Sequence, residues 1–388
     1  MKPLEGILAL DFSQYLAGPS AALRLADLGA RVIKVENPVT GDNSRHLSLK
    51  NMVADGDSVN FYAINRNKES FAANLKDPED LKVVKRLVDQ ADVLIENFRP
   101  GVMGKFGLDY ESVRQTNPRI VYASITGYGT KGPWRNKPGQ DLLVQSMSGL
   151  AYLNGNADQP PVPFGVSIAD TYTGTHVVDG ILACLVRRGR TGQGGHVEAS
   201  LLESILSLQF ETLTTYLNDG HQLPRRSRIN NAHAYLSAPY GIYETADSYL
   251  ALAMGSVTEL GRLLGCKELE GCTDPDSWFD QRDEIKETLQ RHLMGDTTAH
   301  WLELLNEGGY WASEVLNWRQ LLEQEAFQTL DFLQTMQRPG QPELLTTRCP
   351  IRYNRQLLRS ERWAPRLGEN NEQILADFHL LDGKGAEA

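Results

Sequence analysis

The sequence predicts an α/β protein built on a parallel β-sheet, because short apolar runs alternate with amphipathic helical segments along its first third. The run GILALDF, residues 6–12, has the continuous apolar character of a strand buried on both faces. The segment AGPSAALRLADLGA, residues 17–30, follows with helical spacing, and Gly29 marks its end. RVIKVE, residues 31–36, is strand-like again, so these residues predict one βαβ unit.

This alternation continues to about residue 126. SFAANL and DVLIENF are strand-like and flank the helical segment DPEDLKVVKRLVDQA, whose start is marked by Asp77 and Pro78. The segments ESVRQT and RIVYASIT then supply another helix and another strand. Strands that alternate with helices of about ten residues are joined by helical crossovers, so their sheet is parallel.

The pattern changes after the first third. From Gln140 to about Tyr216 the chain is mainly helical, with one strand near GHVEAS. Residues 218–234 are polar and carry Pro and Gly, as a linker does. APYGIYETADSYLALAMG then predicts a β-hairpin, and helices follow near EIKETLQRHL and TAHWLELLNE. We therefore expect a large domain whose first segment is residues 1–217, and a smaller domain at residues 235–333.

The composition disfavours several classes of protein. The 388 residues carry a formal net charge of −10, which argues against nucleic acid or a membrane surface as a partner. No run of roughly 18 apolar residues is present, and the first residues lack the apolar region of a signal peptide. The four cysteines form no C-x-x-C pair, so we expect reduced thiols in a cytoplasmic protein.

Familiar cofactor motifs are also missing. The eight histidines show no ligand spacing, with or without the cysteines, so no metal site is expected. The first strand is not followed by G-x-G-x-x-G, and the chain has no P-loop and no G-x-S-x-G. Dinucleotide, ATP and serine-hydrolase chemistry therefore have no support in the sequence.

Asp170 is the candidate nucleophile. It precedes a strongly helical segment, so its carboxylate is expected among free backbone N–H groups at the positive end of a helix dipole. That environment favours the ionised form, which a carboxylate nucleophile needs. The alternative is that Asp170 is only the N-cap of this helix, which is the common role of aspartate in such a place.

Basic residues are the candidate ligands for an anion. Several follow predicted strand ends, where open α/β sheets bind their ligands. A nucleotide with a pyrophosphate and a 3′-phosphate needs such groups, although each of these residues is equally compatible with an ordinary solvated surface. They are Lys34, Lys68, Lys76, Arg99, Lys105, Lys131, Arg135 and Lys137.

Several longer segments resemble one family. They are LEGILALDFSQYLAGP, GARVIKVENPVTGDNSR, NRNKESFAANLK, ADVLIENFRPGVMGKFGLDY, NPRIVYASITGYGTKGP, GVSIADTYTG and RTGQGGHVEASLLES. Together they are similar to the class III CoA-transferases, the CaiB–BaiF family that includes formyl-CoA transferase. The resemblance runs from Leu4 to about Leu201, and it resumes at Cys349-Pro350 and at APRLGENNEQIL.

The resemblance implies that Asp170, in GVSIADTYTG, is the catalytic nucleophile. Some relatives carry Arg where this chain has Asn37, which puts one contact with a phosphate or the adenine in doubt. By motif, the residues that bind coenzyme A would be Tyr15, Leu16, Ala17, Asn37, Ala73, Asn74, Leu75, Lys76, Asn97, Phe98, Arg99, Lys105, Pro138, Gly139, Gln140 and Asp141.

The resemblance also implies a reaction. Asp170 would attack an acyl-CoA thioester, and an aspartyl anhydride and an aspartyl-CoA thioester would follow before CoA reaches a small carboxylic acid. Acyl-CoA would be a substrate, and no tightly bound cofactor is expected. Water would have to be excluded. Some relatives use a glycine-run loop for this purpose, and Met254-Gly255-Ser256 is only a weak substitute.

The fold implied by the resemblance is a Rossmann-like parallel-sheet large domain plus a smaller α+β domain. Residues 334–388 would link the two and return to the large domain. Two copies of the chain would form an interlinked homodimer, in which each subunit threads through the other.

Two other functions stay open. A 2-methylacyl-CoA racemase of the same superfamily needs a second acid/base group, and by resemblance this is a histidine where the present chain has Gln140. A non-catalytic CoA-binding protein would need no nucleophile. A dicarboxylic acceptor such as oxalate or succinate would suit a clamp made by Arg45 and Arg66, although Arg45 is equally expected to pair with an acid within the fold.

Overall fold

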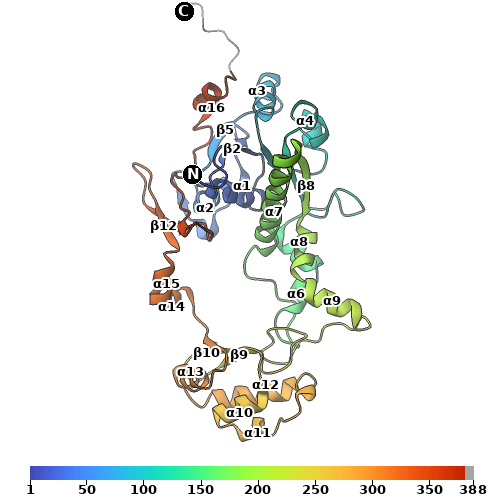
Figure 1. Cartoon of the computed structure of the whole chain (residues 1–388), viewed down its shortest axis with the longest axis vertical. Helices are drawn as coiled ribbons and strands as arrows, with labels where there is room; N and C mark the ends of the chain where they lie inside the picture. Colours follow the sequence, from blue (N-terminus) through green and yellow to red (C-terminus); the bar gives the residue numbers. More distant parts are fainter. Residues whose placement is uncertain (381–388) are drawn as a thin grey trace, which may run out of the picture. The chain divides into compact units, whose positions relative to one another are not determined.

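The computed structural model describes residues 1–380 and contains the predicted parallel sheet. Six strands lie in the order β5-β2-β1-β6-β7-β8, and every neighbouring pair is parallel (Figure 1). The chain progresses outward in both directions from β1, which is the strand order of a Rossmann fold. The strands are β1 (Leu8–Asp11), β2 (Arg31–Glu36), β5 (Glu69–Ala72), β6 (Val93–Glu96), β7 (Val121–Thr126) and β8 (Gly195–Ser200).

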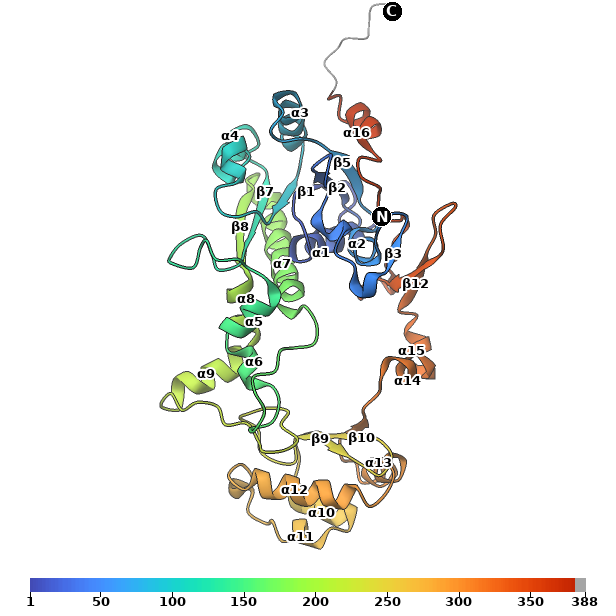
Figure 2. The same ribbon diagram turned by 180° about the vertical axis from the view of Figure 1, so that it is seen from behind.

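Helices cover both faces of this sheet (Figure 2). On one face, α1 (Ala17–Asp27) packs against α7 (Ile168–Thr191). The two helices approach so closely that a Cβ on Gly174 would lie 2.4 Å from Ser20 Oγ. A side chain at position 174 would therefore force them apart. On the other face, α3 (Pro78–Val88) and α4 (Tyr110–Thr116) bury an apolar core with the sheet.

The end of the described chain returns to the sheet. Asn370 Oδ1 accepts the N–H of Ser70 at 2.9 Å, and Asn371 Oδ1 accepts the N–H of Ala72 at 2.8 Å. Asn371 Nδ2 also donates to the carbonyl of Ala72 at 3.0 Å. These bonds occupy the outer edge of β5, so α16 (Asn371–Asp377) and its N-terminal residues protect that edge.

Contacts divide the chain into two compact units. Unit 1 consists of Met1–Val144, Ser167–Leu208 and the chain from Leu330 onward, and unit 2 consists of Gln145–Val166 and Gln209–Thr329. The domain boundaries expected from the sequence stay a prediction.

Unit 2 contains the predicted hairpin. β9 (Gly241–Glu244) and β10 (Tyr249–Leu252) are antiparallel, and β11 (Ala312–Glu314) joins β10 on its other edge. The core of this unit packs the hairpin against its helices through side chains such as Tyr243 and Leu289. The helices of this core are α10 (Val257–Leu264), α11 (Lys267–Glu270), α12 (Arg282–Leu293) and α13 (Thr298–Glu307).

The remaining elements are short, and none of the helices within residues 1–380 combines the length and apolar character needed to cross a membrane. All four cysteines are free thiols. The short elements include β3 (Val53–Ala54), β4 (Asp57–Ser58), α2 (Val59–Asn65), α5 (Asp141–Met147), α6 (Leu150–Leu153), α8 (Leu201–Leu208), α9 (Phe210–Asn218), α14 (Trp318–Glu323), α15 (Glu325–Leu330), β12 (Leu333–Met336), β13 (Leu344–Thr347), β14 (Arg352–Tyr353) and β15 (Gln356–Leu357).

Candidate functional site

A cavity of about 280 Å³ opens where the carboxyl ends of four parallel strands meet. Its walls come from β1, β2, β5 and β6 and from the loops that follow them, which is where open α/β sheets bind ligands. The lining residues are Phe12, Ser13, Gln14, Lys34, Val35, Glu36, Asn37, Thr40, Gly41, Asp42, Asn43, Ala73, Asn74, Leu75, Lys76, Phe98, Val102 and Phe106.

The chemistry of this cavity suits a nucleotide. Phe12, Leu75, Phe98 and Phe106 provide apolar wall, against which a flat base can pack. Amide side chains and the ammonium group of Lys76 provide polar groups on the same lining. One ligand with an aromatic ring and an anionic tail can use both kinds of surface.

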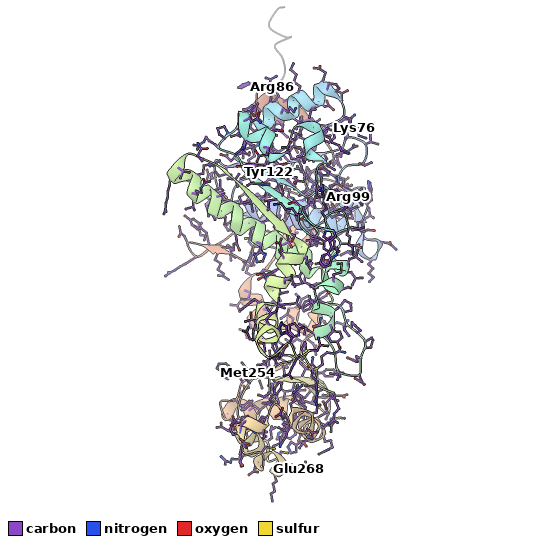
Figure 3. The ribbon with its side chains drawn as sticks, turned by 90° about the vertical axis from the view of Figure 1, so that its right-hand side faces the viewer. Lys76, Arg86, Arg99, Tyr122, Met254 and Glu268 are labelled. Atoms are coloured by element: carbon purple, nitrogen blue, oxygen red, sulfur yellow. The ribbon has the colours of Figure 1, made fainter. Side chains whose placement is uncertain are left out.

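Six of the residues expected to bind CoA line this cavity together: Asn37, Ala73, Asn74, Leu75, Lys76 and Phe98. Arg99 and Lys105 are exposed neighbours of lining residues in the chain. Figure 3 shows the side chains of Lys76 and Arg99 toward the same margin of unit 1. Asn97 does not line the cavity but binds the loop after β1: its side chain accepts the N–H of Gln14 at 2.8 Å and donates to the Gln14 carbonyl at 2.7 Å.

The predicted segment Tyr15 to Ala17 joins β1 to α1. Tyr15 has φ +67°, which is strained for a residue with a side chain, and its N–H donates to Asp42 Oδ1 at 3.1 Å. Tyr15 is exposed, Leu16 is half-buried and Ala17 is buried in the first turn of α1. Asp42 therefore fixes the conformation of this loop from the cavity side.

Two of the candidate anion ligands are buried in ion pairs. Lys34 Nζ lies 2.7 Å from Asp42 Oδ2 and 3.6 Å from Asp11 Oδ2, and Lys68 Nζ donates to Asp11 Oδ2 at 2.8 Å. All four side chains are inaccessible to solvent. Burial lowers the pKa of Lys68 to about 8, although the charge of Asp11 opposes this shift. The expectation that Lys34 and Lys68 present free charges to phosphates was wrong, because carboxylates within the fold already neutralise them.

The proposed carboxylate clamp is also wrong. Arg45 is 3% exposed and binds Glu36 at 2.7 Å and Asp57 at 2.6 Å, while its guanidinium lies 3.9 Å from the centre of the Phe61 ring. Arg66 is 4% exposed and donates to Ser360 Oγ at 2.8 Å. Both guanidinium groups are used to hold unit 1 together, so neither reaches a substrate.

Asp170 lies within the first turn of α7, three residues after the N-cap residue Ser167. Its side chain is half-buried, and within residues 1–380 its carboxylate forms no hydrogen bond or ion pair. Burial, and then the nearby charge of Asp141, raise the pKa of Asp170 to about 7. The expectations that Asp170 precedes the helix and that its surroundings favour the ionised form were therefore wrong, because desolvation outweighs the helix dipole.

Asp141 contacts the same turn of α7. Its Oδ2 accepts the N–H groups of Ala169 at 2.7 Å and of Asp170 at 3.1 Å. The family resemblance implies that Asp141 binds coenzyme A, and nothing in the local sequence shows that its side chain reaches a helix that starts 27 residues later.

The predicted segment Pro138 to Gln140 does not line the cavity and leads directly into α5. Gly139 packs against Gly127, where a Cβ on Gly139 would lie 2.5 Å from the Gly127 Cα. The side chain of Gln140 is exposed.

Sequence reasoning missed several cavity residues, including Phe12, Gln14, Asn43 and Phe106. Phe12 and Gln14 directly follow β1, so the rule that ligands bind beyond carboxyl strand ends was the available signal. Glu96 was also missed. Its Oε2 accepts the N–H of Phe98 at 2.9 Å and so helps to position the part of the cavity wall that Phe98 forms. Burial raises the pKa of Glu96 to about 7. Among residues 1–380, no cluster of three potential metal ligands is present.

The model of CoA-transferase family III matches residues 4–371. The chain belongs to this family. A succinate–glutarate CoA-transferase of Agrobacterium fabrum is 34% identical over 98% of this chain and 96% of its own length. An acetyl-CoA:oxalate CoA-transferase of Acetobacter aceti is 36% identical over 79% of each chain.

A solved structure has the same fold. The crystal structure of a CaiB/BaiF family protein from Brucella suis matches with a TM-score of 0.83 and 32% identity, covering 97% of this chain and 99% of that chain. The resemblance stated from the motifs is thus confirmed, as is the enzyme class: this protein is a family III CoA-transferase. Its cavity is accordingly the candidate CoA site, and Asp170 is the candidate nucleophile in the same unit.

Proposed function

We propose that this family III CoA-transferase moves CoA from an acyl-CoA donor to a small dicarboxylic acid, with Asp170 as the nucleophile. The observation that carries the proposal is the half-buried carboxylate of Asp170, which the fold leaves without a partner in the first turn of α7. The relatives named for succinate, glutarate and oxalate support a dicarboxylic substrate.

The reaction proceeds through two covalent states of Asp170. Its carboxylate attacks the thioester carbonyl, the C–S bond breaks, and CoA thiolate leaves a mixed anhydride. The thiolate then attacks the Asp170 carbonyl carbon, which releases the donor acid and forms an aspartyl-CoA thioester. The acceptor carboxylate displaces the thiolate in turn, and the thiolate attacks the acceptor carbonyl to give the new acyl-CoA and free Asp170. Each attack develops an oxyanion that needs nearby donors.

We infer that CoA enters with its adenosine in the cavity. The aromatic wall, which includes Phe12 and Phe98, supports this placement, and the exposed cations Lys76, Arg99 and Lys105 suit its phosphates. The full set of proposed CoA contacts remains Tyr15, Leu16, Ala17, Asn37, Ala73, Asn74, Leu75, Lys76, Asn97, Phe98, Arg99, Lys105, Pro138, Gly139, Gln140 and Asp141.

The decisive experiment traps the intermediate. The protein is incubated with succinyl-CoA, quenched with hydroxylamine, and digested for mass spectrometry, with glutarate and oxalate as acceptors in parallel reactions. We expect a hydroxamate on Asp170 and new acyl-CoA with at least one dicarboxylate. Full transfer activity in Asp170→Ala would refute the covalent route, whereas CoA binding without any acyl exchange would favour a non-catalytic CoA-binding protein.

The racemase alternative turns on Gln140. A glutamine amide cannot carry a proton between the faces of a substrate carbon, whereas a histidine can. We therefore expect no deuterium at the α-carbon when (2R)-2-methylacyl-CoA is incubated with the protein in deuterated water. Incorporation as fast as CoA transfer would show that the protein is a racemase.

We also infer an interlinked homodimer, which a second copy of the chain would complete. A second copy of the chain would cover exposed apolar side chains on several helices, which supports this proposal. Light scattering that gives a monomer would refute this proposal, and rapid exchange between tagged and untagged subunits would refute the interlinking. The exposed side chains on α5, α8 and α9 include Leu142, Leu143, Met147, Leu208, Phe210 and Leu217.

A further inference from the structure

The first turn of α7 receives its capping carboxylate from another helix. Ser167 occupies the N-cap position, but its side chain forms no capping hydrogen bond. Asp141, at the start of α5, instead accepts the N–H groups of Ala169 and Asp170 through one oxygen, at 2.7 Å and 3.1 Å. The side chain of Asp141 is buried, so water does not compete strongly for these donors.

This arrangement ties the backbone of the nucleophile to a distant segment. Asp141 follows Gly139 and Gln140 at the end of the loop between β7 and α5, and Gly139 packs against Gly127, the first residue of that loop. A local cap at Ser167 would order α7 without involving α5. The cap from Asp141 instead makes the position of Asp170 depend on where β7 and α5 place the 127–141 segment.

The same contact carries an electrostatic cost. Two carboxylates lie close together, and the charge of Asp141 adds to burial in raising the pKa of Asp170 to about 7. Asp141 is the charged group that acts on Asp170 from α5. On α7 itself, the ring of Tyr172 lies 4.5 Å from the ring of His176, and His176 Nδ1 lies 3.1 Å from Ser204 Oγ of α8. The contact therefore fixes the first turn of α7 even though it disfavours the ionised form of Asp170.

We propose that Asp141 is a positioning residue of the transferase: it replaces the N-cap of α7 and thereby holds Asp170 in the place from which it attacks the thioester. This inference rests on the proposed function, because it gives Asp170 the role of nucleophile. It differs from a direct contact between Asp141 and coenzyme A, which the family pattern suggests.

Three variants separate these roles. Asp141→Ala removes both the acceptor and the charge, and we expect kcat to fall by about 10- to 100-fold with the KM for acyl-CoA changed less than about threefold, since a small misplacement of a reacting group has effects of this size. Asp141→Asn keeps an acceptor oxygen without the charge, so kcat at pH 8 should stay within about threefold of wild type. Adding Ser167→Asp to Asp141→Ala supplies a local cap and should recover at least about fivefold in kcat.

A second readout does not depend on turnover. The carboxyl group of Asp170 is labelled with a carbodiimide and an amine at pH values between 5 and 9, and the modified peptide is quantified by mass spectrometry. In Asp141→Asn the midpoint of this titration should lie below that of wild type, because the like charge has been removed. Asp109→Ala, which removes the N-cap of α4 on the other face of the sheet, is the matched control and should leave both the midpoint and kcat unchanged.

Wild-type kcat in Asp141→Ala would overturn the proposal, as would equal losses in Asp141→Ala and Asp141→Asn. A raised KM with unchanged kcat would assign Asp141 to coenzyme A instead. Failure of Ser167→Asp to recover any activity would also count against capping. The proposed function fails separately, if wild-type protein yields no adduct on Asp170 with succinyl-CoA.

Discussion

Buried acids in two regions of unit 1 have pKa values shifted in opposite directions. At the base of the cavity, Asp11 and Asp42 are paired with Lys34 and Lys68. Burial opposes their ionisation, but the lysine charges outweigh it and lower the pKa of both carboxyls. In the first turn of α7, Asp170 has no cation beside it, and burial raises its pKa to about 7.

This difference distinguishes Asp11 and Asp42, which stabilise the fold, from Asp170, which we propose reacts with the substrate. The paired acids are fully committed: Asp42 also accepts the N–H groups of Tyr15 and Ser44, and Lys34 donates to the carbonyl of Ser13 at 2.8 Å. These bonds set the shape of the loop that enters α1. The carboxylate of Asp170 instead accepts no hydrogen bond from residues 1–380, and its raised pKa indicates a more basic oxygen, as the proposed nucleophile requires.

The largest expected effect is on turnover. Asp170→Asn should reduce CoA transfer by at least about 10³-fold, since an amide cannot form the anhydride and the remaining groups only bind substrate. The variant should retain its circular dichroism spectrum and its affinity for CoA, measured by calorimetry. Asp109→Asn on α4 serves as the control at a capping aspartate outside the site. Transfer within tenfold of wild type would mean that Asp170 is not the nucleophile.

We expect loss of the ion pairs that Lys34 forms with Asp11 and Asp42 to lower the stability of the fold. Lys34→Met leaves Asp42 and Asp11 with an uncompensated buried charge, which typically costs about 3–5 kcal/mol of unfolding free energy. Urea unfolding at pH 8 measures the loss, and the double variant Lys34→Met, Asp42→Asn should recover part of it because fewer charges remain unpaired. A loss below about 1 kcal/mol would show that the network is not what holds this loop.

Much of the sheet was predictable because strands leave a local signature. RVIKVE matches β2 residue for residue, and the hairpin of β9 and β10 was visible in its alternating pattern. The motif around Asp170 also identified the candidate nucleophile. These signals lie within a few consecutive residues, where the chain's own propensities act.

Apart from the start of α7, which lies two residues before Asp170, the errors concern side-chain contacts that form only in the folded chain. The sequence suggests Lys68 as a phosphate ligand because it shows the charge of Lys68 but not the contact with Asp11, which lies 57 positions away. Arg45 donates a hydrogen bond to the carbonyl of Pro365, which lies 320 positions later in the sequence. Asp141 and Asp170 are 29 positions apart, so neither the cap of α7 nor the raised pKa could be derived from periodicity. Burial decides the role of each of these groups, and it is a property of the folded chain.

The raised pKa of Asp170 predicts how turnover depends on pH. The protonated carboxyl cannot attack a thioester, so kcat/KM for the acyl-CoA donor should fall by about tenfold for each pH unit below 7 and level off above it. Initial rates between pH 5 and 9, with thioester stability checked in enzyme-free samples, test this. A flat profile from pH 5 to 8 would mean that Asp170 is ionised throughout and that burial does not control it.

The smallest expected effect is on the pH dependence of stability, and its sign is opposite to that of a paired acid. The pKa of Asp170 is about 7 in the folded protein, against an ordinary value of 3.8, so the fold favours the protonated form. This contribution to stability is complete below about pH 4 and is lost as pH rises through 7.

An asparagine resembles the protonated carboxyl, so Asp170→Asn should be more stable than wild type at pH 8. A shift of about three units corresponds to at most about 4 kcal/mol, and partial hydration of this half-buried group reduces the expected gain to about 1–2 kcal/mol. Urea unfolding at pH 8 and pH 4.5, at one protein concentration, measures the difference, which should be about fourfold smaller at the lower pH. Because Asp11 has a lowered pKa, Asp11→Asn should instead be less stable than wild type at pH 8. If Asp170→Asn also lowered stability at pH 8, the carboxylate would have to be stabilised by the fold, and the contrast between the two regions would not hold.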